Sequence, residues 1–190
     1  SNFFGTTILG WYSFAFGTVM RPVHFIGEAF RQVLYQKISL HYNEGREILS
    51  IVKKTMFALF GIAGPMMLIV LFFGKPLFRI LFGDKWIAAG GYAQIMAVWI
   101  LFRFIASAMS IIPLVLGKQK QNFQISIVNN FLPPLVLVIT GLSGMAFEST
   151  LLSFVFVNVL CLSGWLFWYL WICKNHISLV CPKQKGVVTE

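Results

Sequence analysis

Long apolar runs separated by short polar stretches dominate the sequence. A transmembrane helix needs roughly 20 predominantly apolar residues, and five runs close to that length follow one another along the chain. We therefore predict an all-α membrane protein with about five transmembrane helices. The predicted spans are 11–34, 56–73, 87–116, 123–142 and 151–172, which together form one bundle within residues 1–172.

The connections between these runs are short and polar. Residues 36–54 are predicted to form a loop or an interfacial helix. Residues 74–86 are predicted to form a loop whose apolar stretch, 77–82, is too short to span and lies in the membrane interface. The other polar segments are two tight turns, at 117–122 and 143–150, and a polar tail at 173–190.

Prolines and glycines interrupt two of the predicted spans. The Pro133–Pro134 pair removes two backbone donors, so we expect the fourth span to bend or break there. Gly61 and Gly64 in the second span permit either a hinge or close packing against another helix, and we expect close packing.

Composition agrees with a membrane environment. The chain is 58% hydrophobic and only 11% charged, whereas a soluble domain carries about 25% charged residues. A net charge of +9 would suggest nucleic-acid binding in a soluble protein. Here the basic residues lie between apolar runs, so we interpret them as topology signals and as contacts with anionic membrane lipids, and expect no nucleic-acid partner.

The distribution of Lys and Arg predicts the orientation. Ten of them lie in or beside segment 36–54, turn 117–122 and the tail, against three in segment 74–86. Cytoplasmic loops carry the excess of basic residues, so the first group is expected in the cytoplasm of a multi-pass inner (plasma) membrane protein. This orientation begins the first span outside, and no signal peptide is present, so we expect further N-terminal helices of the same protein before Ser1.

The first span carries four ionisable residues at helical spacing: Arg21, His24, Glu28 and Arg31. They fall within one arc of roughly 80° on a helical wheel. Such groups are costly at membrane depth and usually face a bundle interior or an aqueous cavity. Two interpretations fit: the stripe lines a cavity for a polar or anionic substrate, or it pairs internally, His24 with Glu28 and Glu28 with Arg31.

Two further spans contribute polar candidates. Arg103 lies near the middle of the third span, with Trp99, Ser107 and Ser110 on nearly the same face. A membrane Arg needs a partner, which is either an acid such as Glu28 or a ligand phosphate that accepts two guanidinium hydrogen bonds. Asn129 and its neighbour Asn130 either hydrogen-bond to adjacent helices or line the same cavity.

No constellation for catalysis or metal binding is visible. The three histidines, His24, His41 and His176, are far apart and have no metal-ligand partners nearby. The three cysteines show no CxxC spacing, and no nucleophile or phosphate-loop motif occurs. We therefore expect a protein that is not an enzyme and that needs no cofactor or metal.

Several short stretches resemble a known family when they are taken in order. The chain as a whole is similar to the bacterial polysaccharide-biosynthesis flippases of the multidrug/oligosaccharidyl-lipid/polysaccharide transporter superfamily. The stretches are GWYS at 10–13, VLYQKIS at 33–39, YNEGR at 42–46, FGKPL at 73–77, LFGDKW at 81–86, AGGYAQIMA at 89–97, FRF at 102–104 and LGKQ at 116–119.

The resemblance implies a transporter of about 12–14 helices in two bundles, of which this chain would form most of the second. It implies flipping of a polyprenyl-diphosphate-linked oligosaccharide, an O-antigen, lipopolysaccharide or exopolysaccharide precursor, by alternating access. A proton or sodium gradient is the implied energy source, with His24 and Glu28 as titratable candidates. The candidate cavity residues remain Arg21, His24, Glu28, Arg31, Arg103 and Asn129.

Other functions stay open at this point. A drug or small-molecule exporter of the same superfamily would favour acidic cavity residues, whereas bases outnumber acids in these spans. A membrane-embedded polysaccharide polymerase or acyltransferase would need long extramembrane loops with His, Asp or Arg clusters. An accessory subunit without a transport role would leave the intramembrane charges unexplained.

Overall fold

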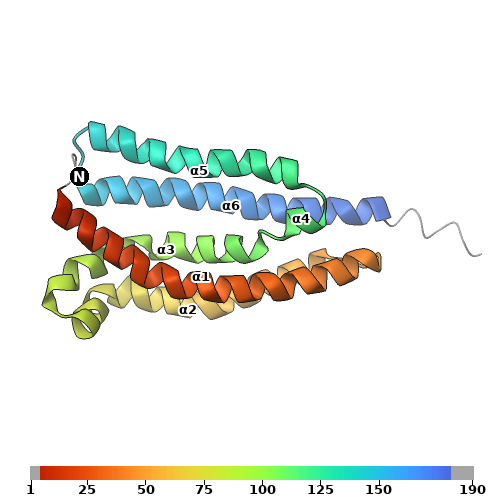
Figure 1. The fold of residues 1–190 in the computed structure, drawn as a ribbon, viewed down its shortest axis with the longest axis horizontal. Helices are drawn as coiled ribbons and strands as arrows, with labels where there is room; N and C mark the ends of the chain where they lie inside the picture. Colours follow the sequence, from red (N-terminus) through yellow and green to blue (C-terminus); the bar gives the residue numbers. More distant parts are fainter. Residues whose placement is uncertain (1–4, 181–190) are drawn as a thin grey trace, which may run out of the picture.

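A computed structural model describes the backbone of residues 5–180 and the side chains of residues 5–175. All regular elements in this part of the chain are helical, as predicted, and five long helices run up and down beside one another (Figure 1). The elements are α1 (Thr6–Asn43), α2 (Leu49–Phe82), the 3₁₀ helix η1 (Asp84–Trp86), α3 (Ile87–Met109), α4 (Ile112–Val115), α5 (Gln119–Leu142) and α6 (Phe147–Val180).

Four helical segments of the described chain are long and apolar enough to cross a membrane: Leu49–Phe82, Asp84–Val115, Gln119–Leu142 and Phe147–Asn175. The fifth helix, α1, has 38 residues and is long enough. Its charged and polar residues lower its hydropathy, which sets it apart from the other four. About five helices therefore agree with the prediction, and α1 is the one that needs a polar environment along part of its length.

Several predicted boundaries are wrong because the helices are longer than their apolar runs. Residues 36–54 are not a separate loop or interfacial helix, because α1 continues to Asn43 and α2 begins at Leu49. Only residues 44–48 connect the two helices. Stretch 77–82 is not a separate interfacial segment but the last part of α2, which continues through Pro76. Every backbone group in a bilayer must be hydrogen-bonded internally, which favours continuing a helix over starting a loop.

The C-terminal half of the chain also departs from the predicted bounds. Helix α5 is unbroken through Pro133 and Pro134, so a break there is wrong, whereas a bend stays a prediction. The third span is divided, because α3 ends at Met109 and the short α4 follows. The first part of the predicted polar tail belongs to α6, which ends at Val180, while residues 181–190 lie outside the described residues.

Helix α3 is the centre of the bundle. It packs against α1 and α2 on one side and α6 on the other, and α5 reaches the bundle through α6 (Figure 1). Its buried positions include Ala89, Ala93, Ala97 and Ala108, which allow neighbouring helices to approach closely. Because α3 contacts α1, α2 and α6, each of its faces lies against a different helix.

The backbones of α2 and α3 meet at two glycines. A Cβ atom built on Gly74 would lie 2.7 Å from the carbonyl oxygen of Gly90, and one built on Gly90 would lie 2.8 Å from Cα of Lys75. The Gln94 amide nitrogen donates to the carbonyl oxygen of Phe72 beside this contact, at 3.3 Å. A side chain at either glycine has to push the two backbones apart.

Gly61 and Gly64, which were predicted to pack closely against another helix, do not contact one in the described chain. Nothing lies within 4 Å of a Cβ built on Gly61 or Gly64, so the expectation of close packing there is wrong. The buried face of α2 runs through Leu59, Ala63 and Met67 instead.

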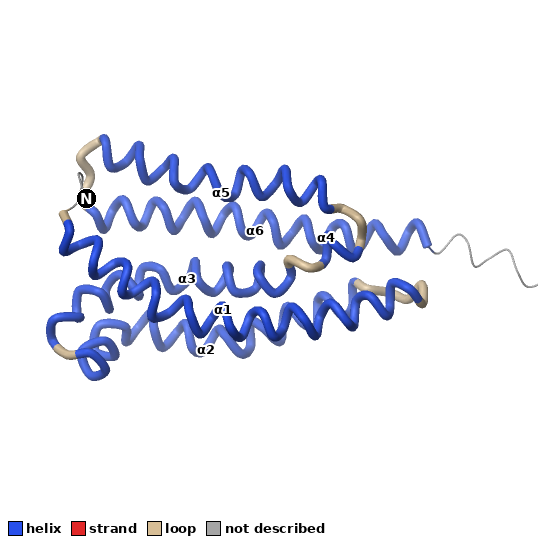
Figure 2. The backbone as a smooth tube through the Cα atoms, in the orientation of Figure 1, coloured by secondary structure: helices blue, strands red, loops and turns tan. Residues whose placement is uncertain are grey.

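The connections alternate between the two ends of the bundle. Loop 44–48, the α4–α5 turn and the C-terminal end of α6 lie at one end, and η1 and the α5–α6 turn lie at the other (Figure 2). The basic segments predicted to share one side of the membrane therefore do lie at one end of the molecule, as far as the chain is described.

We expect Gly90→Ala to lower the thermal stability of the protein, because the added Cβ overlaps the backbone of α2. Gly164→Ala is the matched control, since nothing lies within 4 Å of a Cβ at that helical position of α6. The measurement is the unfolding temperature of the purified protein in detergent. Equal unfolding temperatures for the two variants would contradict the Gly74–Gly90 contact.

Candidate functional site

A polar pocket lies among α1, α3, α5 and α6. It has a volume of about 160 Å³ and lies among residues from the middle of the helices rather than from the connections. We call it the polar pocket. It is lined by Phe16 and Met20 of α1, Trp99 and Arg103 of α3, Asn129, Asn130, Pro133 and Pro134 of α5, and Phe154 and Asn158 of α6.

An aromatic frame holds the indole of Trp99 in this pocket. The Phe16 ring stacks on it with centroids 5.8 Å apart, and the Phe154 ring meets it edge-on at 5.3 Å. Trp99 is only 6% exposed, and its Nε1 is buried without a hydrogen-bond partner among the described residues. A buried N–H without an acceptor is uncommon in folded proteins, which marks this position as unusual.

Asparagine side chains from two helices complete the polar part. The Nδ2 atom of Asn129 is also buried without a partner among the described residues. By contrast, Asn130 donates to the carbonyl oxygen of Ser126 and Asn158 donates to that of Phe154, each at 2.8 Å. Asn129 is therefore the asparagine of this pocket whose amide nitrogen is buried with neither N–H bonded.

Arg103 carries the positive charge of the pocket. It makes no ion pair and no hydrogen bond within the described part of the chain. The sequence left Glu28 open as its acidic partner, but Glu28 bonds to Arg31 instead. The guanidinium of Arg103 is consequently free to bind something else.

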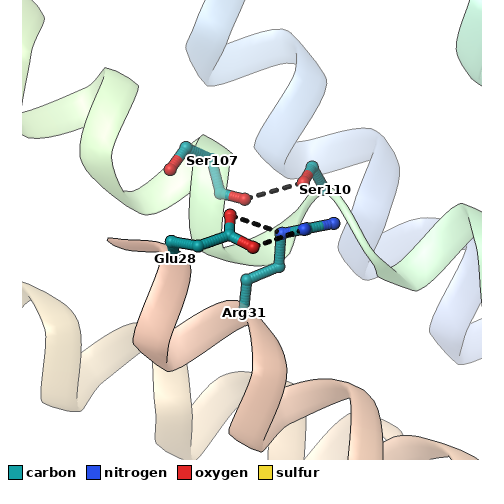
Figure 3. A network of polar contacts seen from close by, with 4 residues as sticks. All are labelled: Glu28, Arg31, Ser107 and Ser110. Carbon is teal, nitrogen blue, oxygen red and sulfur yellow. Dashed lines mark hydrogen bonds and ion pairs between the residues drawn. The ribbon is translucent and has the colours of Figure 1, made fainter. Parts of the chain in front are cut away.

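Glu28 and Arg31 form an ion pair within α1. Arg31 Nε donates to Glu28 Oε2 at 2.9 Å, and a second bond joins its terminal nitrogen to the other carboxylate oxygen. Figure 3 shows the pair directed toward the end of α3, where the Ser110 hydroxyl donates to the carbonyl oxygen of Ser107 at 2.7 Å. Of the two interpretations of the α1 stripe, internal pairing is therefore correct for Glu28 and Arg31.

The close approach of α1 to α3 at this point depends on Gly27. A Cβ atom there would lie 2.8 Å from the Ser107 hydroxyl oxygen. Arg31 also borders a second cavity of about 290 Å³, which it shares with Gln32, Tyr35, Gln36 and Ile111. Part of the α1 stripe therefore borders a cavity, separate from the polar pocket.

The structure brings together only some of the predicted site residues. Arg103 and Asn129 share the polar pocket, whereas Glu28 and Arg31 form their own pair. Arg21 and His24 are exposed on α1, and neither lines either of these cavities. Their role as cavity residues stays a prediction that depends on what covers this face of α1.

Sequence reasoning missed two members of the pocket as site residues. Trp99 was placed on the Arg103 face, but not in a pocket shared with α5 and α6. Asn158 is a single polar residue within the apolar run of α6 and is almost fully buried. A lone amide in such a run was the available signal, but it does not show which helix the amide faces.

Comparison with known proteins gives one partial match. Residues 1–90 match the family profile described as polysaccharide biosynthesis protein, which supports the polysaccharide-biosynthesis family. The matched region holds α1, α2 and the start of α3, and it ends before Arg103 and Asn129. No curated protein and no solved structure matches the chain.

We expect Arg103→Gln to leave the unfolding temperature in detergent unchanged, because no acid depends on Arg103 for its partner. Arg31→Gln should lower it slightly, since Glu28 then loses the two hydrogen bonds from the Arg31 guanidinium. If Arg103→Gln destabilised the protein and adding Glu28→Gln restored it, Arg103 and Glu28 would be paired in the membrane after all.

Proposed function

We propose that the protein exports lipid-linked oligosaccharide or polysaccharide precursors, flipping them across the inner membrane by alternating access. The observation that carries the proposal is the unpaired Arg103 in a polar pocket within a membrane bundle. The polysaccharide-biosynthesis match over residues 1–90 supports the choice of cargo. An intramembrane charge of this kind typically marks a substrate pathway.

The chemistry of the pocket supports binding rather than catalysis. Its lining contains no carboxylate, histidine, cysteine or hydroxyl side chain, so it offers no general acid, base or nucleophile. The exposed guanidinium of Arg103 instead suits a ligand held by charge-assisted hydrogen bonds. This favours a transporter over a membrane-embedded polymerase or acyltransferase.

The sign of the charge favours an anionic cargo. A polyprenyl-diphosphate-linked oligosaccharide carries phosphate groups, and guanidinium binds phosphate oxygens in a bidentate manner. A cationic drug would be repelled by Arg103, and no acid lines the polar pocket to offset that charge. The glycolipid is therefore the better fit than a cationic small molecule.

The exposed face of α1 supports a second bundle. Arg21 and His24 are exposed there, and charged side chains facing lipid at mid-membrane are costly. Further helices of the same protein would cover this face and convert it into one wall of an aqueous cavity. Within that cavity His24 and Glu28 are the groups that could respond to a coupling proton or sodium ion.

We expect Arg103→Ala, and likewise Arg21→Ala, to reduce export at least tenfold while leaving protein abundance normal, because each removes a cation that binds the cargo. Arg103→Lys should retain partial export, since the charge stays while bidentate geometry is lost. Surface polysaccharide and protein level are measured together in cells. Arg46→Ala, in the exposed loop 44–48, is the control. Normal polysaccharide in Arg103→Ala cells would contradict the proposal.

The proposed orientation predicts a labelling pattern. In a variant whose native cysteines are replaced by Ser, a cysteine at Arg46 or at Lys183 in the tail should react only from the cytoplasm. One at Asp84, in η1 at the opposite end, should react from outside, because the basic connections stay in the cytoplasm. An impermeant thiol reagent applied to intact cells makes the measurement, and labelling at Arg46 from outside would reverse the orientation.

A further inference from the structure

A larger polar cavity lies at the end of the bundle that holds η1 and the α5–α6 turn (Figure 2). Its volume is about 630 Å³, within the range of about 300–1,000 Å³ that is usual for small-molecule sites. We call it the end cavity, and it shares no lining residue with the polar pocket. Its polar and aromatic lining residues are Trp11 of α1, Lys75 of α2, Asp84 and Lys85 of η1, Tyr92 and Gln94 of α3, and Glu148 of α6.

Unpaired lysines give the end cavity a surplus of positive charge. Asp84 accepts a hydrogen bond from Nε of Arg79 at 2.7 Å, so its charge is already compensated. By contrast, Lys75, Lys85 and Glu148 form no ion pair with any described residue. All three are exposed where they line the cavity. Two free cations therefore stand against one free carboxylate.

Neutral groups in the wall of the end cavity add hydrogen-bonding capacity. The amide nitrogen of Gln94 donates to the carbonyl oxygen of Phe72 at 3.3 Å, which leaves the amide oxygen as an acceptor. The Tyr92 ring packs edge-on against Phe147, with centroids 5.0 Å apart. Neither the Gln94 oxygen nor the Tyr92 hydroxyl has a hydrogen-bond partner in the described chain, and neither atom is fully buried. Both are therefore accessible to a ligand.

These groups match the chemistry of an acidic sugar. A sugar ring has an apolar C–H face, for which the half-buried ring of Trp11 offers an aromatic surface. Its hydroxyls both donate and accept hydrogen bonds, as the Tyr92 hydroxyl and the Gln94 oxygen require. A sugar carboxylate matches the ammonium groups of Lys75 and Lys85, since charge-assisted hydrogen bonds are stronger than neutral ones.

We propose that the end cavity binds an acidic sugar residue, a hexuronate, of the saccharide that the protein exports. The lysines hold its carboxylate, while Glu148 accepts hydrogen bonds from its hydroxyls and disfavours a compact polyanion such as phosphate. A metal ion does not suit the cavity, because two lysines line it. The described residues also contain no cluster of three or more His, Cys, Asp or Glu that could hold one.

This inference rests on the proposed function and deepens it by naming the class of sugar. The end cavity lies opposite the basic connections, at the end that the proposed orientation places outside. It would therefore receive the saccharide at the exit side of the membrane, apart from the Arg103 pocket. An acidic sugar and a free anion share a negative charge, so the experiment has to separate them.

The test is binding to the purified protein in nanodiscs of zwitterionic phosphatidylcholine, measured by calorimetry at constant ionic strength. The probes are digalacturonate, the neutral disaccharide of the same linkage, and inorganic phosphate. We expect saturable binding of digalacturonate, with the neutral disaccharide and phosphate each binding about tenfold more weakly or worse. The neutral disaccharide lacks the charge, and phosphate lacks the sugar face and hydroxyls.

Substitutions separate the contribution of charge from that of the aromatic surface. Lys75→Gln and Lys85→Gln should each weaken digalacturonate binding by about tenfold and leave the neutral disaccharide unaffected. Trp11→Ala should weaken both disaccharides by about three- to tenfold. The matched controls are Lys54→Gln and Trp171→Ala, at exposed positions toward the other end of the bundle.

Lys75 needs a second variant because its stem lies against α3. A Cβ atom built on Gly91 would be 3.1 Å from Cε of Lys75. If Lys75→Gln disturbs this packing and the protein fails to fold, Lys85→Gln in the exposed η1 segment decides the role of charge.

Three results overturn the sugar site: no saturable binding of digalacturonate, phosphate binding that is as tight as digalacturonate binding, or binding that the end-cavity variants leave unchanged. Export is measured separately in cells, as surface polysaccharide. Digalacturonate binding without any export contradicts the proposed function and leaves the sugar site, whereas export without saturable digalacturonate binding contradicts the sugar site alone.

Discussion

The backbone contact between Gly74 of α2 and Gly90 of α3 sets how closely α2 approaches the central helix α3. With no side chain between them, α3 sits deep in the bundle and touches α1, α2 and α6. Helix packing in lipid depends on such close approaches, because lipid tails compete equally for apolar side chains. The positions of Trp99 and Arg103 follow from this, since both are carried by α3.

The charges of the bundle divide into two kinds. Glu28 and Arg31 neutralise each other on α1 beside the end of α3, which makes that part of the helix tolerable without a ligand. Arg103 has no such partner in the described chain, and it is exposed where it lines the polar pocket. A charge that is left unpaired where pairing would stabilise the fold points to a role in binding.

Much of the fold could be predicted from the pattern of apolar residues. The five long helices, their alternation and the gathering of basic connections at one end all follow from run length and charge. The helix ends could not be predicted, because Pro76, Pro133 and Pro134 were taken as signs of loops or breaks. Inside a bilayer the cost of an unbonded backbone outweighs the local effect of a proline, so α2 and α5 continue through them.

For the site, the sequence by itself determined that Arg103, Asn129 and the α1 stripe are polar groups within apolar surroundings. Only the tertiary structure decided that Arg103 and Asn129 line one pocket, that Glu28 bonds to Arg31 rather than to Arg103, and that Arg21 and His24 stay exposed. Helical periodicity fixes the direction of a side chain around its own axis. It does not fix which helix lies in that direction, because that depends on small residues such as Gly27, Gly74 and Gly90 that let particular helices approach.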